Sequence, residues 1–193
     1  MDTRLPITKD LLSDIISSLR MVCSSTFERF LFSAAFSIAF HGCFRVGELT
    51  YDKRKSQRHY LKLADISFSP DAVIIFLKSS KTDQAGTGSK ITLNRKKGDP
   101  TCPVSLLSSY SDHRPQGSEI LFTHFDGSPL TGYQFSAILK KSLAVLGIDH
   151  TRYTSHSFRI GSATNGFLGG LSESDIKELG RWKSKAYTAY IRS

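Results

Sequence analysis

Two side chains that can bind an anion, His156 and Arg159, lie three positions apart in the last quarter of the sequence. On a helix this spacing puts both on one face, where they can contact the same small group. A neutral imidazole both donates and accepts a hydrogen bond, and a guanidinium offers a planar fork that matches two phosphoryl oxygens. The pair therefore predicts a phosphate-binding site.

A second group of reactive side chains follows closely. It consists of a basic turn, Gly-Arg-Trp-Lys-Ser, which contains Arg181 and Trp182, and two tyrosines, Tyr187 and Tyr190. A tyrosine hydroxyl has a free pKa of about 10, so it needs cationic surroundings or a base before it can attack phosphorus. Fixed cations would also offset the charge that builds on the non-bridging oxygens. These residue types suit nucleophilic cleavage of a phosphodiester.

An arginine motif, Arg45-Val-Gly-Glu48-Leu, lies about a hundred residues before His156. Alone, an arginine followed at the third position by a carboxylate usually forms a structural ion pair. Together with His156-x-x-Arg159 and Leu-Gly-Arg-Trp followed by Tyr190, however, it resembles in order and spacing the catalytic domain of the tyrosine recombinases, the phage integrase family. The sequences Gly-Arg-Trp-Lys-Ser and Tyr-Ile-Arg look more like recombinases of eukaryotic mobile elements, the Crypton and DIRS types, than like bacterial ones.

The resemblance implies DNA strand cleavage and rejoining through a 3′-phosphotyrosyl link, in site-specific recombination or integration, without a metal, nucleotide or other cofactor. It implies that Arg45 and Arg159 contact the scissile phosphate and that Glu48 orients this network. His156 would be a further donor and the acceptor of the nucleophile's proton. Tyr190, ten residues after Gly180, would be the nucleophile.

Three site assignments that the resemblance implies have alternatives: the nucleophile, the sixth active-site contact and the lysine. Tyr187 is a rival nucleophile. The family has its histidine or tryptophan directly after the glycine, where this chain has Arg181, so either Arg181 or Trp182 could supply the sixth active-site contact. A hairpin lysine in the family protonates the leaving 5′-oxygen, and Lys81-Thr-Asp resembles that position. Lys78 is the alternative to Lys81; Lys78 and Arg181 are also expected to contact DNA.

Hydrophobic periodicity predicts the elements that must position these residues. Two helices are expected first, one capped by Thr8 and one ending near Gly42. Later helices should begin near Pro103, span 131–146 and begin near Ser172. Between them, alternating apolar residues separated by turn sequences predict three strands at 61–68, 72–77 and 89–93. The predicted fold is α+β, mainly helical with a small three-stranded antiparallel sheet.

Composition agrees with a polyanionic partner. The chain has 193 residues, 39% of them hydrophobic, and a net charge of +9, which makes a polyanion the first partner to consider. The resemblance to tyrosine recombinases implies that this partner is double-stranded DNA. Three scattered cysteines and widely separated histidines, among them His113, His124 and His150, predict neither disulfides nor a metal site. Without a signal sequence or a long apolar run, we expect a soluble intracellular protein, nuclear if eukaryotic and otherwise cytoplasmic.

We expect residues 1–193 to form a single recombinase catalytic domain, without the family's N-terminal DNA-clamping domain and its last, subunit-exchanging helix. On DNA such domains would act as a homo-oligomer, a tetramer for recombination. Two other hypotheses remain: a catalytically inactive DNA-binding module derived from a mobile-element recombinase, and a basic interaction domain unrelated to nucleic acids. Type IB topoisomerases use similar chemistry, so the sequence does not separate relaxation from recombination.

Overall fold

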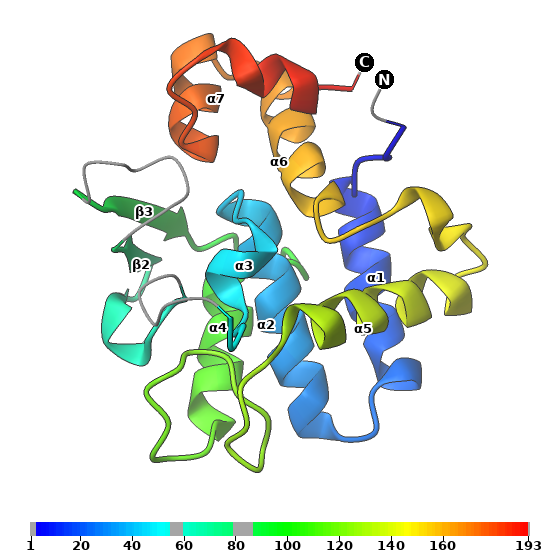
Figure 1. Cartoon of the computed structure of the whole chain (residues 1–193), viewed down its shortest axis with the longest axis vertical. Coiled ribbons are helices and arrows are strands. Elements are labelled where there is room, and N and C mark those ends of the chain that lie inside the picture. The colour runs from blue at the N-terminus through cyan, green and yellow to red at the C-terminus, as the bar shows by residue number, and fades with distance from the viewer. Residues whose placement is uncertain (1–2, 55–59, 79–86, 193) are drawn as a thin grey trace.

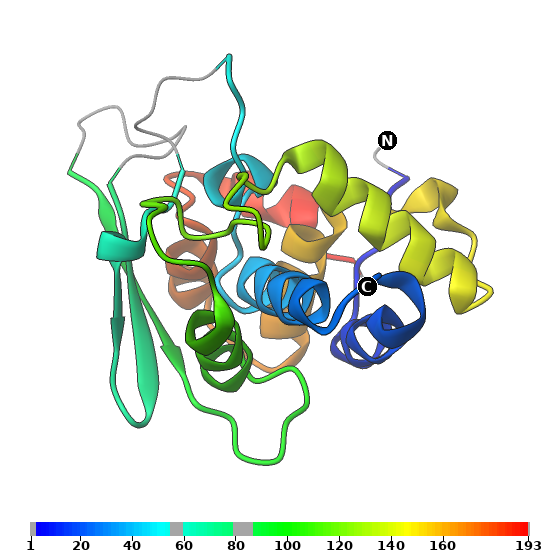
Figure 2. The same ribbon diagram turned by 90° about the horizontal axis from the view of Figure 1, so that it is seen from below.

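The computed structural model describes residues 3–54, 60–78 and 87–192 (Figure 1). Within these ranges it is mainly helical, with one small sheet at the side of the helices (Figure 2). The helices are α1 (Lys9–Val22), α2 (Thr26–His41), α3 (Val46–Leu49), α4 (Pro103–His113), α5 (Gly132–Val145), α6 (Ser157–Leu168) and α7 (Glu173–Gly180). The strands are β1 (Ile66–Phe68), β2 (Ala72–Leu77) and β3 (Ser89–Asn94), and short 3-10 turns cover Leu63–Asp65, His150–Arg152 and Lys185–Tyr190.

The helix boundaries follow the capping residues seen in the sequence. The hydroxyl of Thr8 accepts a hydrogen bond from the backbone N–H of Leu11, at 3.1 Å, and so begins α1. Gly42 is the C-cap of α2. Gly147, with a φ of +71°, follows the end of α5, where a left-handed residue stops a helix. These predictions are confirmed.

The sheet is antiparallel with strand order β1-β2-β3, as predicted, but its first strand is shorter than expected. Ile75 of β2 pairs with Ile66 on one side and Ile91 on the other. The segment before Ile66 forms a 3-10 turn because the Asp65 carboxylate accepts a hydrogen bond from the backbone N–H of Lys62, at 2.9 Å. That contact competes with pairing along a strand.

The main core surrounds α2. Every residue of α2 from 31 to 40 is buried, so this part of the helix is enclosed on all sides. The ring of Phe36 packs against those of Phe135 in α5 and Phe158 in α6, with centroids 4.8 and 5.2 Å apart. No helix in the described ranges is long and apolar enough to span a bilayer.

A second, smaller core lies beneath the C-terminal end of the chain. Its buried members come from the α2–α3 loop, α6, α7, the segment after α7 and the last 3-10 turn: Cys43, Ala163, Ile176, Trp182 and Tyr187. In Figure 1, α7 and the last turn lie together at one end of the molecule, above α6. This core therefore attaches the C-terminal segment to the rest of the domain.

Candidate active site

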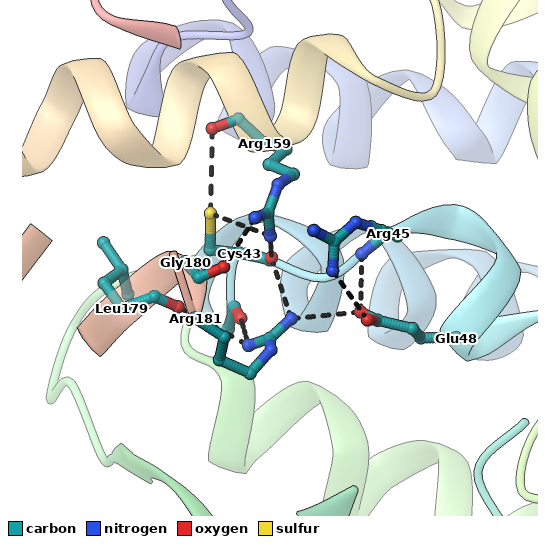
Figure 3. Close-up of polar contacts among 8 residues, drawn as sticks. Cys43, Arg45, Glu48, Arg159, Leu179, Gly180 and Arg181 are labelled. Atoms are coloured by element: carbon teal, nitrogen blue, oxygen red, sulfur yellow. Dashed lines mark hydrogen bonds and ion pairs between the residues drawn. The ribbon is translucent and has the colours of Figure 1, made fainter. Parts of the chain in front are cut away.

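Three arginines from distant parts of the sequence meet where the α2–α3 loop, α6 and the end of α7 come together (Figure 3). Arg45 is the N-cap residue of α3, Arg159 lies in the first turn of α6, and Arg181 is the C-cap residue of α7. They surround two shared acceptors, the backbone carbonyl of Cys43 and the carboxylate of Glu48. The loop after α2 thus brings together the first arginine motif and the C-terminal motifs.

Arg159 is the most enclosed of the three, with no exposed surface. Its Nη1 donates to the carbonyl of Cys43 and its Nη2 to the carbonyl of Gly180. Its Cζ lies 4.2 Å from the ring centroid of Trp182 and 5.4 Å from that of Tyr190, within range of cation–π attraction. Burial lowers the pKa of Arg159, and the charges of the other two arginines act in the same direction. Carbonyl dipoles and aromatic faces compensate this buried charge.

Arg45 remains partly open. Its Nη1 contacts Glu48 Oε1 at 3.2 Å, and its backbone N–H donates to Glu48 Oε2 at 2.8 Å. The side chain of Arg45 is 23% exposed, whereas that of Glu48 is 7% exposed. The ion pair expected from the sequence is therefore present, and the guanidinium still has an accessible side that an anion can reach.

Arg181 points inward. It adopts a left-handed conformation, with a φ of +57°, and its side chain is 8% exposed. Its Nη1 donates to the carbonyl of Gly42 at 3.0 Å, while Nη2 lies 3.1 Å from the carbonyl of Cys43 and 3.0 Å from Glu48 Oε2. Little of this side chain is therefore accessible to solvent.

Tyr190 packs among the other predicted site residues. Its ring centroid is 4.9 Å from that of His156, at the N-terminus of α6, and 4.9 Å from that of Trp182. The last turn is tied to α6 because the hydroxyl of Thr164 donates to the carbonyl of Tyr190, at 3.2 Å. Arg159, His156, Trp182 and Tyr190 therefore form one cluster.

Tyr187, the rival nucleophile, faces α7. Its side chain belongs to the second core, and the Nζ of Lys177 lies 5.7 Å from its ring centroid. Burial and the nearby carboxylate of Glu173 raise the pKa of Tyr187. A raised pKa makes the phenolate, the attacking form, harder to reach.

The two candidate lysines differ in what can be described. Lys81 lies outside the described residues. The Nζ of Lys78 forms an ion pair with Asp65 Oδ1 at 2.7 Å, and its side chain is 58% exposed. Within the described ranges, no three histidine, cysteine or acidic side chains gather in a way that could hold a metal ion.

The backbone carbonyls that hold Arg159 have no signature in the sequence of side chains. Cys43 adopts a φ of +48°, which is uncommon for a residue with a Cβ, and its carbonyl accepts from both Arg159 and Arg181. Because every residue carries a carbonyl, only the geometry of the loop reveals this role.

Comparison with known proteins identifies a matching family and a similar protein. A model described as the phage integrase family matches residues 9–192. An "Integrase/recombinase xerD homolog" of Selenomonas ruminantium is 27% identical over 138 residues, which is 68% of this chain and 40% of that protein. The chain thus spans less than half of this relative.

Two solved structures, both under 25% identical, confirm the predicted fold. The XerH site-specific recombinase bound to its difH substrate has a TM-score of 0.72 at 16% identity, and the match covers 100% of this chain and 52% of XerH. A lambda integrase dimer bound to a COC′ core site has a TM-score of 0.68 at 19% identity, covering 98% and 48%.

Proposed function

Because this chain belongs to the phage integrase family, we propose that it breaks and rejoins DNA strands in site-specific recombination. The observation that carries the proposal is the single cluster formed by Arg159, His156, Trp182 and Tyr190, with Arg45 beside it. The net charge of +9 suits a polyanionic substrate.

In the proposed reaction the hydroxyl oxygen of Tyr190 attacks the scissile phosphorus, and the bond to the 5′-oxygen breaks. His156, whose ring packs on that of Tyr190, takes the phenolic proton. The product is a 3′-phosphotyrosyl link and a free 5′-hydroxyl. Attack on that link by the 5′-hydroxyl of another strand releases the tyrosine and restores a phosphodiester.

Arg45 and Arg159 would stabilise the negative charge on the non-bridging oxygens. The accessible side of Arg45 supports this directly. The Nε of Arg159 is buried and has no hydrogen-bond acceptor among the described residues, so it is a donor available to a phosphate oxygen. Because Arg159 is covered, the side chain of Trp182 or Tyr190 must move before that contact forms.

Lys81 is our proposed general acid for the leaving 5′-oxygen. The alternative, Lys78, is held by Asp65, and this favours the lysine further along the hairpin. Trp182, rather than Arg181, is the better candidate for the sixth active-site contact because its ring already lies against Arg159 and Tyr190.

Two finer assignments are also proposals. The sequence Gly-Arg-Trp-Lys-Ser supports descent from a eukaryotic mobile element of the Crypton or DIRS type, which would work in the nucleus. A homo-oligomer on DNA is supported by solved relatives described as a dimer and as a tetramer bound to a Holliday junction.

A suicide substrate tests the proposed function. A pool of nicked duplexes of randomised sequence would trap the covalent adduct, because the short strand beyond the cleavage site diffuses away. We expect a DNA-linked, protease-sensitive species with the wild-type protein and with Tyr187→Phe, and none with Tyr190→Phe. Salt-dependent DNA binding without any adduct would instead favour the inactive DNA-binding module.

A further inference from the structure

We propose that Arg181 is a positioning residue that fixes both proposed phosphate-binding arginines, and that it does not itself contact DNA. This inference rests on the proposed function. It assigns a specific task to the residue that occupies the place where the family has its histidine or tryptophan.

The first link runs through Glu48. This carboxylate lies between two guanidinium groups: Oε1 accepts from Arg45 Nη1 at 3.2 Å, and Oε2 accepts from Arg181 Nη2 at 3.0 Å. Side chains of Glu48 and Arg181 are 7% and 8% exposed, so solvent screens their ion pair far less than one on the surface. Arg181 therefore fixes the carboxylate that orients Arg45.

The second link runs through the carbonyl of Cys43. It accepts from Arg159 Nη1 and also from Arg181 Nη2, at 3.1 Å for the latter. Arg181 Nη1 holds the preceding carbonyl, that of Gly42, at 3.0 Å. These bonds hold the loop in the left-handed conformation of Cys43, which aims its carbonyl at Arg159.

The contacts of Arg181 with Glu48 and with the Cys43 carbonyl require a guanidinium group. Two nitrogens of Arg181 donate to two carbonyls of the α2–α3 loop and to the Glu48 carboxylate in α3, whereas lysine would bring a single nitrogen to the same place. Its Cζ also lies 4.9 Å from the ring centroid of Phe44, where a planar cation stacks well. Lysine should therefore restore only part of the arrangement, and glutamine almost none.

Single-turnover cleavage of the nicked substrate tests the inference. Arg181→Gln should slow adduct formation about ten- to a hundredfold, the effect of losing hydrogen bonds to charged groups. Arg181→Lys should lie between this variant and the wild type. The DNA dissociation constant and its salt dependence should change no more than in Arg20→Gln, a matched control at the exposed end of α1. If Arg181→Gln instead raises the DNA dissociation constant and reduces the slope of log affinity against log salt by about one, Arg181 contacts a phosphate and the proposal is overturned.

A double-mutant cycle separates positioning from a general effect on folding. In a Glu48→Gln background, Arg181→Gln should slow cleavage at least about threefold less than it does in the wild type, because one link is already broken. An equal effect in both backgrounds would overturn the role assigned to Glu48.

An NMR measurement of the arginine Nε–Hε resonances in the DNA-free protein tests the inference independently of cleavage. If the wild type forms no adduct, the proposed function is refuted, but the role of Arg181 is still tested by these resonances. We expect the Arg45 and Arg159 signals to shift in Arg181→Gln, to shift less in Arg181→Lys, and to stay in place in Arg20→Gln. Should Arg181→Gln fail to fold, Arg181→Lys carries the same test. Unchanged Arg45 and Arg159 signals would overturn the proposal.

Discussion

Replacing Gly161 by alanine should destabilise the protein, although alanine normally stabilises the interior of a helix. Gly161 lies within α6, where the chain before α1 crosses the helix. A Cβ at this position would overlap the carbonyl group of Ile7. Ile7 cannot yield freely because its backbone N–H donates to the carbonyl of Ser157, at 3.0 Å, and its side chain is fully buried.

The expected loss of unfolding free energy in Gly161→Ala follows from these contacts. Alanine gains about 1 kcal/mol of helix propensity over glycine. Displacing the crossing segment loses about 1 kcal/mol for the Ile7 hydrogen bond and about 2 kcal/mol for exposing its side chain. The net loss is about 2 kcal/mol, which for a chain of this size lowers Tm by about 4–8 °C.

Urea unfolding followed by circular dichroism measures this difference. Gly132→Ala is the matched control, because a Cβ there meets the hydroxyl of Thr50 at 3.4 Å, an ordinary contact. It should change the free energy of unfolding by no more than about 0.5 kcal/mol. If Gly161→Ala proves as stable as the wild type, or more stable, the close approach of Ile7 to α6 is refuted.

Two further predictions concern a partly buried histidine and a buried tryptophan. Burial, and then the charge of Lys96, lower the pKa of His41 from 6.5 to about 4. The native state therefore resists protonation of His41. The contribution of neutral His41 to the free energy of unfolding should be fully present above about pH 6.5 and should fall by about 3 kcal/mol towards pH 4. His41→Gln should flatten this part of the curve in urea unfolding across that range, and an unchanged slope would contradict the assignment. Trp182→Ala should cost about 3–5 kcal/mol, because the indole is 7% exposed and packs on Arg159, while Trp182→Phe should cost less than half as much. An alanine variant within about 1 kcal/mol of the wild type would show that this packing contributes little.

Local rules predicted most elements of the fold. Thr8 and Gly42 mark helix ends in the sequence, and the alternating residues of β2 have one buried face, because capping and periodicity act over a few residues. The first strand was predicted too long, since the hydrogen bond from Lys62 to Asp65 is a side-chain contact that hydrophobic alternation does not reveal.

The arrangement of the site was harder to predict from the sequence than the fold was. Spacing paired His156 with Arg159, and the resemblance to tyrosine recombinases added Arg45 and Tyr190. In the structure these side chains lie close together. The inward direction of Arg181 could not be predicted, because it depends on a left-handed backbone at a position that is not glycine. Whether Lys81 reaches the cluster stays a prediction.

The enclosure of Arg159 has a consequence for measured affinity. If the conformation that admits a phosphate is a minor population, the apparent dissociation constant for DNA exceeds the intrinsic one by the inverse of that population. Substitutions that loosen the packing of Trp182 and Tyr190 on Arg159 would raise that population while making the protein less stable. The accessibility of Arg159 and the stability of the fold would therefore change in opposite directions when these two aromatic contacts are weakened.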